Sequence, residues 1–600
     1  MRNIQREIDQ RQYGDNIPRP PEKPNFYLED PNLQYLMRRY LPASMQEWAD
    51  RELTRFGELV AGPVDERAAY TDREGKPRLV KYNRRGEDIS LIVKNEGYLQ
   101  TVKEVYGMGI VGYLYRDIPE LGCKAPYMYS YLQGYLLSES EPGFYCPVTL
   151  TMSAAHLVDR YGTPEQKEAY LTGLTSLDAE TLYEGATWLT ERQGGSDVGA
   201  NLTVAVPDPE KGPGVYRLTG EKFFASNAGA MVAMVLARVN PDLPGTRGLG
   251  LFLVPWIKPD GTRNSIYVRR LKEKLGVNAV PSAEVILEEA EGYLVGDPDK
   301  GFKYMAEALN ISRICNAVAS AGIMRRAFYE ALHYARERKA FGQTIIQYPM
   351  VKQTLVRMLV ELEVNTGSTF DMIRFFDKSN SGQATPEEDV MARMLIPLIK
   401  YRTGEVAKEL THQAIETLGG NGYIEEYVTP RLLRDAQVLT VWEGTANILA
   451  LDLWRVIQKF RADEVFLQVM QREVEALTHP LSQAFKPGLK QSLQEIRENI
   501  AFLKAQPEDI LTYHLKPLAD QMIDVYQLVC ILKEAEEQAK TDGNARKFIV
   551  AELYRKAHFE PAAKYRIRNT QLPDLTFFEA LVDYQKVDAD VLREKVHQAG

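Results

Sequence analysis

The amino-acid sequence predicts a mainly α-helical protein with a central antiparallel β domain. At 600 residues the chain is too long for one hydrophobic core, so several domains are expected. Apolar residues follow a helical repeat on both sides of a stretch, from about residue 185 to about residue 290, in which the repeat changes to a period of two. The expected organisation is a flexible arm over residues 1–25, a helical N-terminal domain over 26–184, a middle β domain over 185–295, a C-terminal helical bundle over 296–460 and a helical extension over 461–600.

The N-terminal part of the chain carries signals for a loose arm followed by helices. The closely spaced prolines in NIPRPPEKPN cannot join a helix or a central strand. EGYLQTVKEVY repeats apolar residues at helical spacing, and TPEQKEAYL begins with a threonine cap followed by proline. YGMGIVG has the GxGxxG spacing of a dinucleotide-binding loop. Helical periodicity precedes it, however, and no acidic residue follows at the required distance, which favours a helix end and a turn.

The hydrophobic period changes twice in the rest of the chain. Short β-branched and aliphatic runs, separated by Gly, Pro, Asn and Asp, predict strands at VYRLTGEKFF, MVAMVLARV, GLGLFLVPW and SAEVILEE. After GDPDKGF the helical period returns, and segments such as DEVFLQVMQREVEAL continue it into the extension. Two long bundle helices are expected from apolar residues that step by three and four: Met324, Phe328, Ala331 and Ala335 in one, and Val351, Leu355, Met358 and Leu362 in the other.

Composition argues against several classes of protein. The 73 Lys and Arg against 82 Asp and Glu give a net charge of −9, which disfavours bulk attraction to nucleic acid or anionic lipid. The four cysteines and seven histidines are scattered without metal-ligand spacing, so no metal is expected. No apolar run is long enough to cross a bilayer or to act as a signal peptide, which predicts a cytoplasmic protein without membrane insertion.

Two motifs lie in the first part of the expected β domain. WLTERQGGSDVGANL places a threonine, a serine and consecutive glycines in a loop, where hydroxyls and bare backbone N–H groups suit a phosphate or a flavin edge. An ordinary glycine-rich turn explains this motif equally well. In GEKFFASNAGA, Phe223 and Phe224 must point to opposite faces of a strand. We therefore expect one ring in the core and the other available to cover a planar ring.

Three further motifs lie in the expected bundle. ARERKAFGQTIIQYP ends a helix with Arg336, Arg338 and Lys339, which either cap the helix or reach a diphosphate. ETLGGNGYIEEY supplies a second glycine turn. VLTVWEGTANILALDLW places one carboxylate, Glu443, in otherwise apolar sequence, and either Thr445 or the asparagine two residues later could cap the helix that follows.

In combination, the motifs are more specific than any one of them. TERQGGSDV, KFFASN, RERKAFG, LGGNGYIEEY and WEGTANI, in this order, resemble the acyl-CoA dehydrogenase family over roughly residues 30 to 460. QGGSD, CPVTLT and WEG are similar to its AidB-type branch. The resemblance implies an FAD cofactor, an acyl-CoA substrate, a homotetramer built as a dimer of dimers, and an electron-transfer flavoprotein as electron acceptor. In the family's reaction, a base removes the proton alpha to the thioester while hydride leaves the beta carbon for flavin N5.

The resemblance also implies roles for individual residues. Glu443 matches the catalytic base, and Arg313, Trp442 and Ser196 match substrate-binding positions. Arg338, Phe341 and Gln343 fall in the segment that, in this family, reaches the FAD of a neighbouring subunit. The full set of FAD-binding positions is Leu189, Thr190, Ser196, Phe224, Ser226, Arg338, Phe341, Gln343, Gly419, Gly420, Thr445 and Asn447.

Several positions qualify the assignment. Some relatives carry the base on an earlier helix, where this sequence has Ser312, so Glu443 is the candidate that remains. An apolar enclosure would raise the basicity of the carboxylate, as this reaction requires. Trp442 replaces the tyrosine common in the family, which would narrow or reshape the acyl pocket. Glu416 stands where many relatives have Gln near the FAD adenosine, and its charge must be turned away or paired.

DNA binding, oxygen-dependent oxidation and an inactive scaffold are the alternatives to dehydrogenation. AidB-type proteins have been proposed to bind DNA through a basic C-terminal region, but residues 451–600 hold 21 Lys and Arg against 23 Asp and Glu. A local basic stretch, KYRIRNT at Lys564 to Thr570, is more typical of a solvated helix face. An acyl-CoA oxidase that uses oxygen stays open, because sequence does not report oxygen access. An inactive scaffold is disfavoured by the retained Glu443 and Arg313.

Overall fold

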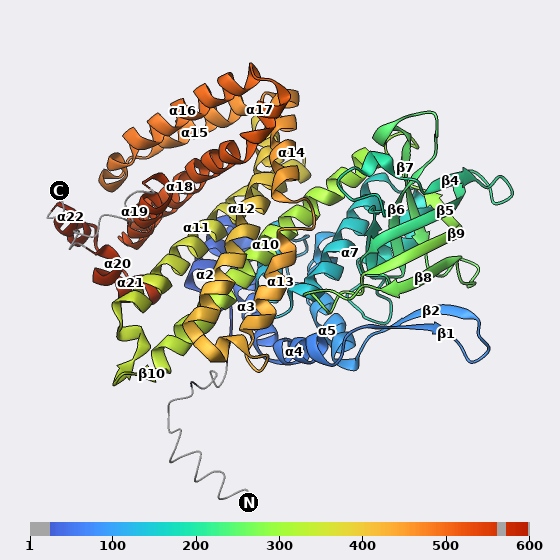
Figure 1. Cartoon of the computed structure of the whole chain (residues 1–600), viewed down its shortest axis with the longest axis horizontal. Coiled ribbons are helices and arrows are strands. Elements are labelled where there is room, and N and C mark those ends of the chain that lie inside the picture. The colour runs from blue at the N-terminus through green and yellow to red at the C-terminus, as the bar shows by residue number, and fades with distance from the viewer. Residues whose placement is uncertain (1–17, 19–23, 561–571, 598–600) are drawn as a thin grey trace, which may run out of the picture. The chain divides into compact units, whose positions relative to one another are not determined.

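The computed structural model describes Pro18, residues 24–560 and residues 572–597 (Figure 1). The chain divides into two compact units. The first, termed here the N-terminal unit, is Asn25–Tyr27 with Leu41–Ala319, and the second, the C-terminal unit, is Leu28–Tyr40 with the described residues from Ser320 onward. Most of the expected arm and the basic stretch from Lys564 to Thr570 lie outside the described residues. Within the described part, no helix is both long enough and apolar enough to span a membrane.

Helices form the first part of the N-terminal unit. Gly109, with φ of +80°, ends the helix of the YGMGIVG motif, which confirms a helix end and turn there. The predicted cap at Thr163 is also confirmed, because it forms a capping box with Gln166. The helical segments are α3 (Ala43–Leu59), η2 (Val60–Val64), α4 (Asp65–Arg73), α5 (Glu96–Gly107), η3 (Gly112–Leu114), α6 (Tyr127–Ser138), α7 (Pro142–Tyr161), α8 (Pro164–Gln166), η4 (Lys167–Leu171) and α9 (Thr172–Leu174).

A β hairpin interrupts these helices, and the sequence did not predict it. Strand β1 (Arg78–Tyr82) pairs antiparallel with β2 (Asp88–Val93). Charged residues such as Arg78 and Lys81 occupy the strands, and only Ser90 of β2 is buried. The hairpin therefore lacks the apolar alternation by which strands are recognised in sequence.

The middle β domain is a seven-stranded sheet that returns on itself. Its order is β3-β6-β4-β5-β9-β7, β8 pairs with β9, and β6 also pairs with β7. Most pairs are antiparallel, as predicted, but β6 runs parallel to both β3 and β4, so the sheet is mixed. The strands are β3 (Gly185–Trp188), β4 (Val204–Pro207), β5 (Val215–Ala225), β6 (Val232–Arg238), β7 (Leu249–Pro255), β8 (Ile266–Leu271) and β9 (Ala283–Leu294), with η5 (Val198–Ala200) and η6 (Gly245–Gly248) between them.

Strand β6 is buried on both faces, which explains its continuous apolar sequence. Ala233 and Val235 face the core enclosed by the sheet. Met234 and Leu236 face the opposite side, where residues of α7 such as Leu157 form a second core. Strand β6 thus packs against the N-terminal helices through one of its two apolar faces.

The C-terminal unit is helical, as predicted. Helix α10 begins in the N-terminal unit and continues into this one, and its predicted apolar seam is buried; in the next helix Val351 is only half-buried. The elements are α2 (Pro31–Tyr40), α10 (Gly301–Glu337), β10 (Lys339–Ala340), β11 (Gln343–Thr344), η7 (Ile345–Gln347), α11 (Pro349–Asn380), α12 (Pro386–Leu418), η8 (Gly419–Tyr423), α13 (Thr429–Leu439), α14 (Ala446–Phe460), α15 (Ala462–Ala476), η9 (Pro480–Ala484), α16 (Lys486–Lys504), α17 (Glu508–Tyr513), α18 (Leu515–Thr541), α19 (Arg546–Phe559), α20 (Pro573–Thr576), α21 (Phe578–Val582) and α22 (Ala589–His597).

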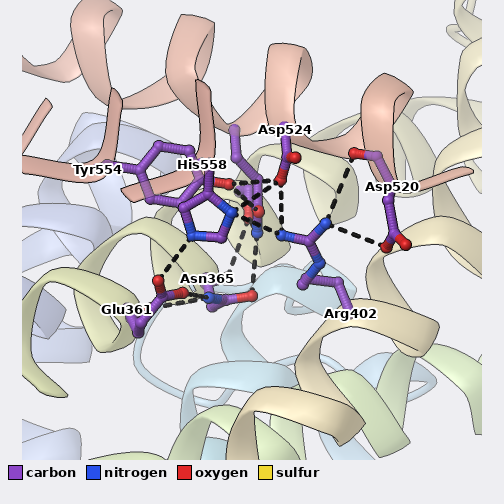
Figure 2. A network of polar contacts seen from close by, with 9 residues as sticks. Glu361, Asn365, Arg402, Asp520, Asp524, Tyr554 and His558 are labelled. Atoms are coloured by element: carbon purple, nitrogen blue, oxygen red, sulfur yellow. Dashed lines mark hydrogen bonds and ion pairs between the residues drawn. The ribbon is translucent and has the colours of Figure 1, made fainter. Parts of the chain in front are cut away.

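Several of the described helices that follow residue 461 pack against the bundle. Helices α18 and α19 pack on α11 and α12, and polar side chains link them across that interface (Figure 2). Arg402 of α12 pairs with Asp524 of α18 at 2.7 Å, and His558 of α19 pairs with Glu361 of α11 at 2.7 Å. Because these groups are largely buried, a charge left without its partner would destabilise the fold. The extension and the bundle therefore share one interior.

Candidate active site

The predicted flavin-edge residues of the N-terminal unit are brought together by two hydrogen bonds. The backbone N–H of Phe223 donates to the carbonyl of Thr190 at 2.9 Å, and the indole N–H of Trp188 donates to the carbonyl of Ser226 at 3.1 Å. The first bond joins the loop after β3 to the end of β5. Leu189, Thr190, Phe224 and Ser226 consequently form one local group.

A buried ion pair that the sequence did not single out fixes this loop. Glu191 and Lys222 are 5% and 0% exposed, and the ammonium nitrogen lies 2.8 Å from the carboxylate oxygen. Glu191 also accepts from the N–H of Leu202 at 2.6 Å and from the hydroxyl of Thr203 at 2.5 Å. Burial alone would raise the pKa of Glu191, but Lys222 and these hydrogen bonds lower that pKa to about 2. Both residues lie inside the motifs TERQGG and GEKFF, and their opposite charges were the signal available.

The two phenylalanines of β5 are not arranged as expected. Neither ring enters the core: Phe224 is 53% exposed and Phe223 is half-buried, whereas Ala225 is buried. The pairing of β5 with β9 shifts register between Lys222 and Ala225, so strict alternation fails there. The ammonium of Lys272 lies 3.2 Å from the centre of the Phe223 ring and 4.6 Å from that of Phe224. The more exposed of the two rings, that of Phe224, stays accessible to solvent.

The glycine loop leaves backbone and hydroxyl groups accessible. Gly194 has φ of +137° and no atom within 4 Å of the position that a Cβ would occupy. A Cβ on Gly195 would meet the Thr190 hydroxyl at 2.7 Å, so glycine is needed for the loop to close on that residue. Ser196 is exposed at the end of the turn. An open, hydroxyl-bearing loop beside an exposed aromatic ring fits the edge and phosphate of a flavin nucleotide.

In the C-terminal unit, the residues after α10 form a short hairpin. Phe341 at its tip has φ of +51° and is 98% exposed. Tyr348 donates from its hydroxyl to the carbonyl of Ala340 at 2.8 Å, which holds the hairpin in place. Arg338 lies at its base and Gln343 is exposed on its second strand. Arg336, in the last turn of α10, is paired with Asp583 of the extension and is thereby assigned a structural role.

The second glycine turn lies beside the end of α10. Asn421 donates from its amide to the hydroxyl of Tyr334 at 3.0 Å, joining η8 to that helix. Gly419 has φ of +63°, and no atom lies within 4 Å of a Cβ position on Gly419 or Gly420. The backbone of the turn is therefore open, as a cofactor contact requires. Glu416, whose charge was expected to need a partner, lies 3.6 Å from the imidazole of His412.

The loop between α13 and α14 carries Glu443. The backbone N–H groups of Val441 and Trp442 both donate to the carbonyl of Val438, at 2.8 and 3.0 Å. Glu443 then adopts φ of +59° and Gly444 φ of +107°. A left-handed conformation is strained for glutamate and is typical of functional positions. Trp442 and Glu443 are half-buried.

The start of α14 differs in detail from the expectation. Thr445 is the N-cap residue, but its side chain makes no capping hydrogen bond. Asn447 is exposed in the first turn. Arg313 is half-buried in the part of α10 that belongs to the N-terminal unit, next to the buried Ser312. The expected residues therefore lie in both units, and hydrogen bonds join Thr190 to Phe223 in one unit and η8 to α10 in the other.

The chain therefore combines a helical domain, a β domain with an exposed aromatic ring and a helical bundle with a carboxylate on a strained loop. Three family models match the chain: the N-terminal domain of the adaptive response protein AidB over residues 16–180, the acyl-CoA dehydrogenase middle domain over 186–290, and the acyl-CoA dehydrogenase C-terminal domain over 299–458.

Individual relatives agree with these matches. Acyl-CoA dehydrogenase family member 11 of Caenorhabditis elegans is 34% identical over 76% of this chain and 74% of its own. The AidB protein of Escherichia coli (strain K12) is 33% identical over 65% of this chain and 72% of its own. The crystal structure of C. elegans ACDH-11 in complex with C11-CoA has a TM-score of 0.82 at 29% identity, covering 90% of this chain and 91% of that one. The apo form of Bd2924 has a TM-score of 0.78 at 29% identity, covering 86% and 98%.

The chain belongs to the acyl-CoA dehydrogenase family and has the N-terminal domain of its AidB-like members. It is therefore an FAD-dependent oxidoreductase that acts on acyl-CoA. The predicted family and fold class are both confirmed. The ACDH-11 structure covers 90% of this chain, which is more than residues 1–460 comprise. Part of the extension therefore has a counterpart in the ACDH-11 structure.

Proposed function

We propose that this protein catalyses the α,β-dehydrogenation of an acyl-CoA thioester with Glu443 as the base. The observation that carries the proposal is the placement of Glu443: a half-buried glutamate with φ of +59°, between Trp442 and a left-handed Gly444. Such a conformation costs free energy and persists where the surrounding structure over-determines it, and residues of this kind cluster at active sites. The neighbouring glycine permits the turn that presents the carboxylate.

The carboxylate must be made a stronger base than it is in water. Enclosure by Trp442 and bound substrate removes water from Glu443, which disfavours its charged form and raises its basicity. Hydrogen bonds to the thioester oxygen would acidify the alpha proton. Bound FAD supplies the acceptor for the hydride that leaves the beta carbon. The side chains of this protein hold and orient the reactants and move the proton to Glu443.

The residues available to hold FAD lie in both units of the chain. In the N-terminal unit they are Leu189, Thr190, Ser196, Phe224 and Ser226. In the C-terminal unit they are Arg338, Phe341, Gln343, Gly419, Gly420, Thr445 and Asn447. The 98% exposure of Phe341 supports contact between its hairpin and the FAD of a second chain, in a dimer of dimers.

Substrate contacts are proposed for Arg313, Trp442 and Ser196. The ACDH-11 structure is a complex with C11-CoA, so acyl chains near that length are the first to test. The proposed electron acceptor is an electron-transfer flavoprotein, with oxygen as the alternative, and the proposed location is the cytoplasm. DNA binding is not favoured, since residues 451–600 carry 21 basic and 23 acidic side chains.

Anaerobic titration with acyl-CoA thioesters of graded length tests the proposal. The flavin absorbance of the wild-type protein should bleach with at least one thioester. Glu443→Gln should keep FAD and fail to bleach. Glu464→Gln is the matched control, because Glu464 is an exposed carboxylate paired with Arg461 on α15. Bleaching of Glu443→Gln at the wild-type rate would refute the assignment of the base.

A further inference from the structure

A buried lysine reaches the loop that carries Glu443. Lys400 of α12 is 1% exposed, and its ammonium group donates to the carbonyl of Gly444 at 2.6 Å. Neighbouring positions of α12, such as Ile396 and Ile399, are also buried. Placing an ammonium group in such surroundings costs free energy unless it is hydrogen-bonded. None of the roles described above uses Lys400.

Helix α12 contacts both ends of the loop that carries Glu443, residues 440–445, termed here the base loop. Gly404 lies one helical turn after Lys400, and a Cβ on Gly404 would stand 3.0 Å from the carbonyl oxygen of Leu439. Positions four apart share one helix face, so Lys400 and Gly404 face the loop together. Gly404 thereby allows close approach at the end of α13, while Lys400 binds the carbonyl just before α14.

The hydrogen bond from Lys400 acts on the strained part of the loop. Glu443 and Gly444 both have positive φ, and the carbonyl that accepts from Lys400 belongs to the second of them, Gly444. An ammonium held at 2.6 Å from that carbonyl fixes its direction, and with it the ψ angle of Gly444. A strained conformation persists only where its surroundings over-determine it, and Lys400 supplies that restraint.

We propose that Lys400 is a positioning residue for Glu443. It fixes the Gly444 carbonyl, and so the direction in which Glu443 presents its carboxylate, without touching the substrate. This inference rests on the proposed function, because it assigns Lys400 a part in the same reaction. Loss of the hydrogen bond should misplace the base and slow the chemical step, with little effect on substrate binding.

Arg402 provides a matched control on the same helix. It is a buried cation, 8% exposed, that pairs with Asp520 at 3.3 Å and with Asp524 at 2.7 Å on α18 (Figure 2). Removing either cation from α12 should destabilise the bundle. Only removal of Lys400 should disturb the base loop.

The experiment compares Lys400→Met, Lys400→Gln, Lys400→Arg and Arg402→Met with the wild-type holoenzyme. Stopped-flow anaerobic flavin reduction by a bleaching thioester gives the limiting reduction rate and the substrate Kd, and hydrogen exchange reports the amides of residues 438–447. Lys400→Met should lower the limiting reduction rate by about 100-fold at nearly unchanged Kd, and Lys400→Gln by about 10-fold. Lys400→Arg, which keeps a charged donor, should recover part of the rate. Faster exchange in the loop should accompany the Met variant but not Arg402→Met.

Distinct outcomes separate the two proposals. If the wild-type protein bleaches and the Lys400 variants bleach equally fast, or if Arg402→Met is slowed as much as they are, Lys400 does not position the base. If Lys400→Met fails to fold, Lys400→Gln decides by the same criteria. If no thioester bleaches the wild-type protein, the proposed function fails and the catalytic role of Lys400 fails with it.

Discussion

Replacing His558 by glutamine should remove a stabilising interaction whose strength depends on pH. The imidazole lies between two carboxylates, with Nε2 2.7 Å from Glu361 and Nδ1 3.2 Å from Asp524 (Figure 2). Burial alone would lower the pKa of His558, but hydrogen bonds and charge from Asp524 and Glu361 outweigh it and raise that pKa to about 9. Arg402 and Tyr554 also face this group.

The size and sign of the effect follow from that pKa. A rise from 6.5 to about 9 corresponds to about 3 kcal/mol, since one pKa unit is worth about 1.4 kcal/mol. The side chain is 21% exposed, and solvent screening leaves about 2–3 kcal/mol. Because the pKa of the folded state lies above that of the unfolded state, the stabilisation is complete below about pH 6.5. It is lost as the pH rises through about 9.

Calorimetric melting of wild type and His558→Gln between pH 6 and pH 10 is the assay. A chain with two compact units need not unfold in one step, so the comparison is of matched transitions at each pH. The Tm difference should be large at pH 6 and shrink toward zero above pH 9. His412→Gln, which removes an exposed imidazole from α12, should show no such trend. A Tm difference that is constant with pH would refute the reasoning.

Three further tests address other parts of the structure. Lys222→Met leaves the Glu191 carboxylate buried without its cation. The free energy of unfolding should fall by about 3–5 kcal/mol, measured by melting, and the FAD content should fall, measured by flavin absorbance. Unchanged FAD content would contradict the role given to this pair. Gly419→Ala should cost about 1–3 kcal/mol through its positive φ, whereas Gly420→Ala in the same turn should be nearly neutral, and equal melting of the two would be contrary evidence. Arg546 of α19 and Glu363 of α11 form a buried ion pair. Arg546→Met should cost about 3–5 kcal/mol of stability, and adding Glu363→Leu should restore much of it. No recovery in the double variant would count against this pair.

The long helices were predictable because their signal is local. In α10 the residues Met324, Phe328, Ala331 and Ala335 repeat one apolar face, and that face is buried whatever packs against it. Strand β6 was predictable as a strand for the same reason. Its parallel partners were not, since pairing depends on segments far away in sequence.

The sequence identified candidate site residues, but not the contacts that hold those residues in place. Thr190 and Phe224 were expected through family motifs, and the structure brings them together. The burial of a phenylalanine was wrongly expected, because the register shift in β5 is set by its partner β9. The contact between Lys400 and Gly444 joins residues 44 apart, and no local pattern reports such a contact. The positions of the base and FAD residues stay predictions until they are tested.

The central claim is that Glu443 removes the alpha proton of an acyl-CoA thioester. A 3-thia-acyl-CoA isolates this step, because sulfur at the beta position cannot release hydride while the alpha proton stays acidic. The measurement is incorporation of solvent deuterium at the alpha carbon by wild type and Glu443→Gln, both loaded with FAD. The account predicts incorporation by the wild-type protein and loss of about 100-fold or more in the variant. Equal incorporation by the two proteins would contradict it.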